Sequence, residues 1–212
     1  TDTSLPAHGF ARTAFWTLES ARADAADGHV LVFHLPSDAG APFGWTFPVD
    51  LRFTVSIGRS LALTLTARNA GTEPVEVGGA LHSYFAVGDV SQLRVRGLED
   101  RSYVDQLAPG SRREQKGDVR FSAETDRVYE DPGPVCVIDD ALLARRITVE
   151  KSGSRSTVVW NPWTEKARRL VDVGEDQFRD FLCVETANAL FDTVTIPPGG
   201  EHRLSVVIRS EI

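Results

Sequence analysis

Alternation of apolar and polar residues along short runs is the feature that most constrains how this chain can fold. The clearest run covers residues 51–57, where leucine, phenylalanine, valine and isoleucine alternate with arginine, threonine and serine. After a short turn at residues 58–60 the same pattern resumes over residues 61–67. Successive side chains of a strand point to opposite faces, so each run buries one face of a sheet. The segment therefore predicts an antiparallel hairpin.

Two more hairpins are predicted later in the chain. One joins residues 194–196 to residues 204–208 across the proline- and glycine-rich turn at 197–200. The other joins residues 147–149 to residues 158–160 across the turn at 152–154. Separate strands are expected at residues 30–33, 75–77, 93–95 and 181–185.

Helical patterns are scarce. Thr164 is a candidate N-cap for a short helix over residues 165–170, and residues 175–181 could add one turn. Many strands at short spacing, separated by Gly, Pro and Asp turns, predict an all-β protein. We expect a twisted antiparallel β-sandwich that forms a single domain over residues 1–212.

The composition excludes several classes of protein. The net charge of −7 argues against a nucleic-acid-binding surface, and no apolar run is long enough to cross a membrane. The first residues lack the pattern of a secretory signal. Cys136 and Cys183 lie in apolar runs, which favours reduced core thiols over a disulfide framework. These features together predict a cytoplasmic protein.

Two ionisable residues interrupt apolar runs that otherwise resemble core strands. His82 lies in Ala80-Leu81-His82-Ser83-Tyr84-Phe85, and Glu185 lies in Cys183-Val184-Glu185-Thr186-Ala187-Asn188. Burial raises the pKa of a glutamate, which is one way to make a general base that works near neutral pH. Two plainer interpretations stay open: a histidine bonded to a backbone carbonyl, and a glutamate facing solvent at a strand end.

The segment His8-Gly9-Phe10-Ala11-Arg12 is a candidate ligand-binding turn. Its glycine allows the backbone to approach a ligand closely, and Arg12 could hold a phosphate or carboxylate with two hydrogen bonds. Arg12 could equally pair with an acidic side chain on the surface.

Aromatic and acidic residues elsewhere suggest a site for a sugar. Trp160 and Trp163 flank a proline turn, and flat indole faces are suited to packing against a sugar ring. They could instead fill the core. Asp126 could accept hydrogen bonds from sugar hydroxyls, or pair with Arg127.

Several other chemistries lack their sequence signals. The five histidines, at positions 8, 29, 34, 82 and 202, form no metal-ligand spacing with cysteine or acidic residues. The chain contains no phosphate-binding P-loop, no dinucleotide-binding glycine motif and no serine nucleophile elbow. We therefore expect neither a metal nor an organic cofactor.

Taken together, these segments resemble the hexose-6-phosphate mutarotases, the glucose-6-phosphate 1-epimerase branch of the aldose 1-epimerase family. The matching motifs occur in the family's order, at residues 5–12, 80–85, 125–129, 160–167 and 183–188. The resemblance implies a β-sandwich of the galactose-mutarotase type, with a sugar bound in an open groove on one sheet. It also implies a monomer or weak homo-oligomer whose partner is a small sugar phosphate.

The resemblance also implies roles for individual residues. The histidine that matches His82 donates a proton to the ring oxygen, and the glutamate that matches Glu185 takes the proton of the anomeric hydroxyl. The residues that match His8 and Asp126 contact the sugar, the one that matches Arg12 helps to hold the 6-phosphate, and Trp163 is expected to contact the substrate.

The chain departs from the family pattern in two places. Family members carry further strands and another phosphate-contacting arginine ahead of this region, so residues 1–212 are expected to be shortened at the N-terminus. Ala7 stands where many relatives have a glutamine.

The predicted reaction opens and recloses the sugar ring and so interconverts the α and β anomers of a hexose 6-phosphate. Two alternatives remain at this stage: an epimerase that acts on free hexoses, and a carbohydrate-binding module without catalysis.

Overall fold

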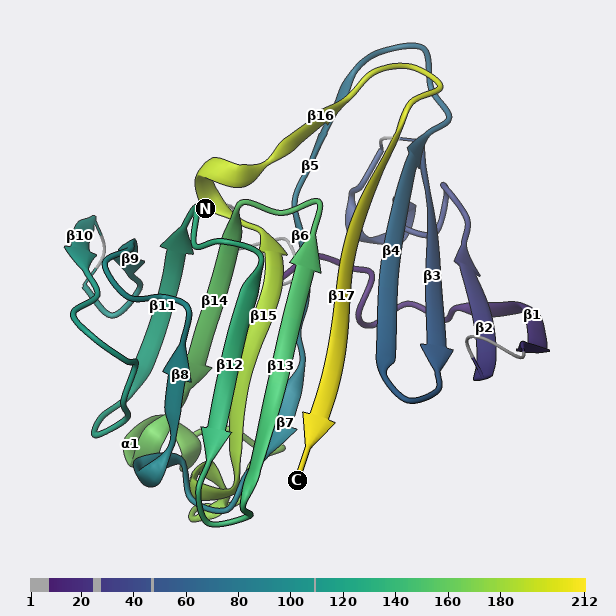
Figure 1. Cartoon of the computed structure of the whole chain (residues 1–212). Helices are drawn as coiled ribbons and strands as arrows, with labels where there is room; N and C mark the ends of the chain where they lie inside the picture. The colour runs from purple at the N-terminus through teal and green to yellow at the C-terminus, as the bar shows by residue number, and fades with distance from the viewer. Residues whose placement is uncertain (1–7, 25–27, 47, 109) are drawn as a thin grey trace.

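The computed structural model describes residues 8–24, 28–46, 48–108 and 110–212. Strands dominate this part of the chain, and the pairings within the two large sheets are antiparallel (Figure 1). The predicted all-β class is therefore confirmed.

Two large sheets and one small sheet contain the strands. In spatial order, the first sheet consists of β1 (Thr17–Asp24), β2 (Gly28–Leu35), β3 (Val49–Ile57), β4 (Leu61–Asn69), β17 (Glu201–Glu211), β13 (Arg145–Ser152), β12 (Val135–Asp140) and β8 (Arg94–Arg96). The second consists of β10 (Ser111–Glu114), β9 (Ser102–Asp105), β11 (Thr125–Glu130), β14 (Ser156–Asn161), β15 (Phe181–Asn188) and β6 (Gly79–Leu81), and β7 (Tyr84–Ala86) also pairs with β15. The small sheet pairs β16 (Val194–Ile196) with β5 (Val75–Val77).

The main core lies between the two large sheets. Ile138 and Val149 come from the first sheet, and Tyr129, Leu182 and Val184 come from the second. All five are almost completely buried, and burial of this apolar area is the main favourable term that holds the layers together. Figure 1 shows β8, β12 and β13 layered over β11, β14 and β15, while β1 to β4 continue the first sheet beyond β17.

The strongest sequence prediction, the hairpin at residues 51–67, is confirmed. Strands β3 and β4 pair from Val49 with Asn69 to Ile57 with Leu61. The separately predicted strands at residues 30–33, 75–77, 93–95 and 181–185 also correspond to observed strands, within one residue at the start of β8.

The two other predicted hairpins are wrong in their pairing, although their strands form. Strand β16 pairs with β5, because both edges of β17 are occupied by β4 and β13. Strands β13 and β14 belong to different sheets, so the turn between them carries the chain across the sandwich. Neighbouring strands in sequence therefore do not pair at these two places.

Helical structure is limited to short segments. The helix α1 (Trp163–Ala167) begins earlier and ends earlier than predicted, and the side chain of Asn161 accepts a hydrogen bond from the Trp163 backbone N–H. Thr164 is therefore not its N-cap. Single 3₁₀ turns lie at Ala41–Phe43, Val90–Gln92, Gln177–Asp180 and Leu190–Asp192.

Both cysteines are buried free thiols, as predicted. Among the described residues, no helix is both long enough and apolar enough to span a bilayer.

Candidate functional site

Strand β15 positions Glu185 on the outer face of the second sheet. Leu182 and Val184 point into the core between the sheets, so alternation along the strand directs Cys183 and Glu185 to the opposite face. β15 is flanked by β14 on one side and by β6 and β7 on the other. Glu185 is nevertheless 6% exposed, because its neighbours on this face cover it.

His82 lies at a break between two short strands that share one register with β15. Leu81 of β6 pairs with Thr186, and Tyr84 of β7 pairs with Cys183. Both pairs belong to one continuous antiparallel register, which places His82 opposite Glu185. The backbone N–H of Ser83 donates to the carbonyl of Leu81 at 3.1 Å, which bends the chain at His82.

The imidazole and the carboxylate are in direct contact. Nε2 of His82 lies 3.2 Å from Oε1 of Glu185, and the side chains are 39% and 7% exposed. The carboxylate therefore lies at the bottom of the site and the imidazole at its opening. The structure brings together the two residues that the sequence predicted as an acid/base pair.

Burial shifts the pKa values of the two groups in opposite directions and reverses their usual order. Burial, with a smaller effect from the charge of Asp126, raises the pKa of Glu185 to about 8. Burial also lowers the pKa of His82 below its usual value, and the charges of His8 and Arg12 lower it further, while a backbone hydrogen bond of His82 opposes this. At neutral pH the pair consequently holds one proton that either partner can carry, and the two groups titrate together.

Two aromatic side chains adjoin His82. The ring of Tyr84 stacks on the imidazole with centroids 4.7 Å apart, and Trp160 packs edge-on against it at 6.0 Å. Phe181 lies behind both rings, 5.4 Å from Tyr84 and 5.8 Å from Trp160. Tyr84 was not predicted as a site residue. Its separation from His82 by two positions was the available signal.

Asp126 lies in the same row across the sheet as Trp160 and Tyr84. Asp126 pairs with Trp160, Trp160 with Cys183, and Cys183 with Tyr84. Burial raises the pKa of Asp126, and Lys166, 3.9 Å from its carboxylate, opposes this shift. Lys166 also lies over the Trp160 ring at 5.8 Å and contacts Glu124 at 3.1 Å. The predicted alternative, an ion pair of Asp126 with Arg127, is not what the structure shows, since Arg127 bonds to Gln115.

The turn that carries His8 and Arg12 is attached to the sandwich by Phe10. The Phe10 ring packs against Phe43 and Trp45, with centroids 6.2 and 5.7 Å away. Gly40 makes this possible, since a Cβ there would come within 2.8 Å of the Phe10 ring. His8 has a positive φ of 62°. Both side chains are exposed, and their charges act on His82. Ala7 lies outside the described residues.

Trp163 is placed differently from Trp160. It packs against the main core cluster, and its ring centroid lies 5.2 Å from that of Phe178. The core-filling interpretation therefore accounts for its contacts, and a substrate contact by Trp163 stays a prediction. In the part of the chain that the structure describes, no three His, Cys, Asp or Glu side chains gather as a metal site.

Comparisons with known proteins give one consistent result. The family model described as aldose 1-epimerase matches residues 1–209. A relative from Cenchrus ciliaris, named "Putative glucose-6-phosphate 1-epimerase", is 35% identical over 211 residues, which cover 94% of this chain and 63% of the relative. An Escherichia coli (strain K12) protein of the same name is 35% identical over 186 residues, covering 87% of this chain and 61% of that protein.

A solved structure agrees with these sequence matches. The crystal structure titled as a "putative mutarotase (YeaD)" from Salmonella typhimurium superposes with a TM-score of 0.89 at 31% identity. The match covers 99% of this chain and 69% of that chain. The chain spans 63% and 61% of the lengths of the two curated relatives above. Since the family model covers nearly every residue, this chain belongs to the aldose 1-epimerase family.

Proposed function

We propose that this chain interconverts the α and β anomers of a hexose 6-phosphate, with glucose 6-phosphate as the preferred substrate. One observation carries the proposal: the 3.2 Å contact between the His82 imidazole and the buried Glu185 carboxylate. A pair that shares one proton can remove a proton from one oxygen and deliver a proton to another. Opening of a pyranose ring requires these two transfers.

In the proposed mechanism Glu185 removes the proton of the O1 hydroxyl while protonated His82 donates to the ring oxygen. The C1–O5 bond breaks and leaves an open-chain aldehyde. Rotation about C1–C2 presents the other face of the carbonyl, and reversal of the two transfers closes the opposite anomer. A positioned proton transfer contributes on the order of 10² to 10⁴ in rate.

The protonation state of the free pair fits this cycle. The raised pKa of Glu185 and the lowered pKa of His82 leave one proton on the pair at neutral pH. Moving that proton from Glu185 to His82 produces the base and the acid that the first step uses. After ring opening the proton is on Glu185, and reclosure leaves it on His82, from which it can return to Glu185 in the free pair.

Neighbouring groups supply contacts for the sugar. Asp126 could accept hydrogen bonds from hydroxyl groups, and the exposed ring of Tyr84 with Trp160 offers an apolar surface beside His82. We propose that His8, whose charge acts on His82, contacts the sugar and that Trp163 contacts the substrate from the start of α1.

The presence of Arg12 favours a phosphorylated sugar over a free sugar as the substrate. Its guanidinium is exposed, and its charge reaches both His82 and Tyr84. A guanidinium binds a phosphate with two parallel hydrogen bonds. The names of the two curated relatives point to the same substrate class.

The substrate class can be tested by exchange NMR, which follows the transfer of magnetisation between anomers. The proposal expects the protein to accelerate anomer exchange of glucose 6-phosphate more than that of glucose. Equal acceleration of both would identify an epimerase of free hexoses. Binding of either sugar without any acceleration would identify a carbohydrate-binding module.

We also propose that residues 1–212 act as one domain in the cytoplasm, as a monomer or weak homo-oligomer. The shared core between the sheets supports one folding unit. The two buried free thiols agree with a reducing compartment.

A further inference from the structure

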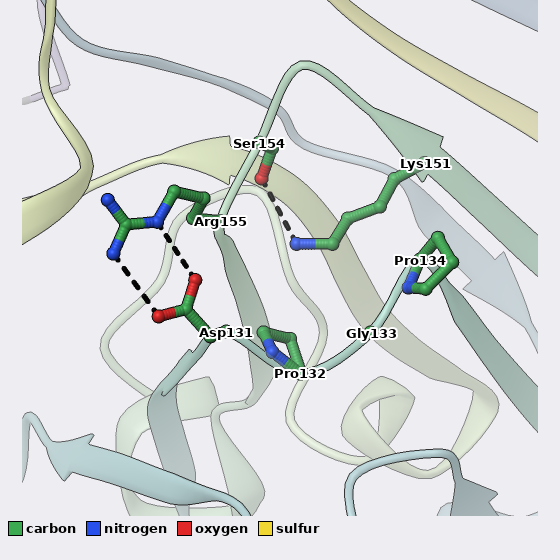
Figure 2. A pocket seen from close by; sticks show the side chains of 7 residues that line it. All are labelled: Asp131, Pro132, Gly133, Pro134, Lys151, Ser154 and Arg155. Carbon is green, nitrogen blue, oxygen red and sulfur yellow. Dashed lines mark hydrogen bonds and ion pairs between the residues drawn. The ribbon is translucent and has the colours of Figure 1, made fainter.

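A pocket of about 280 Å³ lies where the chain crosses between the sheets (Figure 2). It is lined by residues 131–134, Lys151, Ser154 and Arg155. Strand β14 begins beside this pocket and ends beside Trp160 near His82, so the pocket is separate from the proposed sugar site.

Lys151 is buried at this pocket, with 9% of its surface exposed. Its Nζ donates to Oγ of Ser154 at 3.1 Å and to the carbonyl oxygen of Ser156 at 2.7 Å. Figure 2 shows the side chain extended toward Ser154, above the turn that contains Pro132 and Pro134. Among the described residues, no carboxylate forms an ion pair with Nζ.

The turn that follows Lys151, at the end of β13, is tightly packed. Gly153 has a φ of +73°, and a Cβ at this position would lie 1.8 Å from the carbonyl oxygen of Arg203. The hydroxyl groups of Ser154 and Ser156 both donate to the carbonyl of Ala187 on β15. The position of the amine is therefore fixed by neighbouring backbone from both sheets.

Burial makes the amine of Lys151 unusually easy to deprotonate. Desolvation lowers the pKa of Lys151 to about 8, against weaker opposing effects of Cys136, Asp192 and Asp131. The Asp192 carboxylate accepts bonds from the backbone N–H of Arg155 and from the amide of Asn188, which also bonds to His202. The guanidinium of Arg155 adds a positive charge at the rim of the pocket.

The neutral amine matches its surroundings. A neutral lysine has two N–H donors and one lone pair, and Ser154 and Ser156 supply two acceptors. These two bonds leave the lone pair of a neutral Nζ unused, and Lys151 lines the pocket. Lysines that are desolvated in this way serve as nucleophiles toward carbonyl compounds.

Arg155 carries the positive charge that an anionic ligand would contact at this pocket. Its Nε and Nη2 donate to the two oxygens of Asp131 at 2.9 and 3.2 Å (Figure 2). Both side chains are exposed. A phosphate accepts the same two parallel hydrogen bonds and can take the place of this carboxylate.

We propose that Lys151 captures a small aldehyde that carries a phosphate, forming a Schiff base in this pocket while Arg155 binds the phosphate. Neutral Nζ attacks the aldehyde carbon to give a carbinolamine. The carbinolamine loses its hydroxyl group and one amine proton as water, which leaves a carbon–nitrogen double bond. Ser154 lies close enough to pass a proton between nitrogen and oxygen. No redox partner is required.

The chain provides its own controls, because it contains three lysines, at positions 116, 151 and 166. A hydrogen bond to Glu114 raises the pKa of exposed Lys116, and Lys166 contacts Glu124 and Asp126. At pH 7.5 an amine with a pKa of about 8 is neutral in roughly a quarter of molecules, whereas an ordinary lysine is neutral in about 0.1%.

The test is competitive labelling of the native protein with pyridoxal 5′-phosphate at pH 7.5, followed by borohydride reduction and peptide mass spectrometry. We expect Lys151 to be labelled on the order of ten times faster than Lys116 or Lys166, since its larger neutral fraction outweighs its lower exposure and basicity. The rate at Lys151 should level off above about pH 8. Slower labelling of Lys151 than of exposed Lys116 would overturn the proposal, since a protonated structural lysine gives that result.

Two variants test the pocket itself. Lys151→Arg should abolish labelling at the pocket, and Lys116→Arg, its matched control, should leave the labelling of Lys151 unchanged. Arg155→Gln should remove the preference for pyridoxal 5′-phosphate over pyridoxal, whereas Arg168→Gln, which alters another exposed ion pair, should retain it. An unchanged preference in Arg155→Gln would overturn the phosphate assignment. None of these readouts depends on anomer exchange at His82.

Discussion

Nε2 of His82 lies 3.2 Å from Oε1 of Glu185, at the position along β15 where the two short strands β6 and β7 meet. The register of both strands with β15 places the histidine opposite the glutamate, and the bend at His82 interrupts the pairing there. The sheet thus buries the carboxylate while the imidazole remains accessible. This arrangement carries the proposed function.

The rate of anomer exchange should depend on pH as a bell-shaped curve. Loss of the single proton shared by the pair leaves no acid for the ring oxygen, so kcat/KM should fall above about pH 8. Gain of a second proton leaves no base, and because the pKa of His82 is lowered, this fall should begin below pH 6.5. These limits belong to the pair and not to either residue alone. A rate that keeps rising to pH 10 would contradict the shared-proton assignment.

Tyr84 should position the imidazole through its stacked ring. Tyr84→Ala should lower kcat by up to about tenfold, since an aromatic pair contributes about 0.5–1.5 kcal/mol. Tyr84→Phe keeps the ring and should keep most of the activity. The pKa of His82, measured by NMR titration of its ring protons, should return toward its ordinary value in Tyr84→Ala but not in Tyr84→Phe. An unchanged pKa in Tyr84→Ala would contradict this role.

Asp126 should act mainly in binding. Asp126→Asn retains the shape of the side chain but weakens its hydrogen bonds to hydroxyl groups, so KM should rise by roughly tenfold with a smaller change in kcat. Steady-state kinetics of anomer exchange would measure both. Asp100→Asn, at an exposed carboxylate, is the matched control and should leave both constants unchanged. A loss of kcat with constant KM would instead place Asp126 in the proton transfers.

Glu185→Gln should flatten the dependence of stability on pH. The folded pKa of Glu185, about 8, exceeds its ordinary value of 4.5, so the folded state binds the proton more tightly. Glu185 makes its full contribution to the free energy of unfolding below about pH 4.5, and this contribution is lost as the pH rises through about 8. Each pKa unit corresponds to about 1.4 kcal/mol, so the variant should be more stable than the wild type at pH 9 by on the order of a few kcal/mol.

Urea unfolding at pH 7, 8 and 9 would measure this difference. His82 is largely neutral in both folded and unfolded states over this range, so its titration contributes little to the comparison. Parallel stability curves for the wild type and Glu185→Gln would show that the pKa of Glu185 is not raised in the folded protein.

Most strands could be predicted from the sequence, but their partners could not. Alternation over residues 51–67 predicts both strands of the β3–β4 hairpin, and the short turn between them brings them into register. The same reasoning fails at residues 152–154, where an equally short turn crosses from one sheet to the other. Periodicity reports which face is buried, not which sheet buries it.

The sequence pattern could predict only some of the residues of the candidate site. His82 and Glu185 were recognisable because each interrupts an apolar run, where an ionisable side chain is costly to bury. Trp160 was predicted only with a core-filling alternative beside the sugar contact, and Tyr84 was not predicted, since aromatic residues are as common in cores as in sites. Their alignment with Asp126 in one row depends on the register of four strands, which only the three-dimensional structure provides.

The most direct test of the proposed acid/base pair is exchange NMR of glucose 6-phosphate with the wild type, His82→Ala, Glu185→Gln and the double variant. In each single variant the acceleration of anomer exchange should fall by a factor of about 10² to 10⁴. In the double variant it should fall little further, because the two residues act as one unit. Folding of each variant can be checked by circular dichroism. Wild-type exchange rates in either single variant would contradict the central claim.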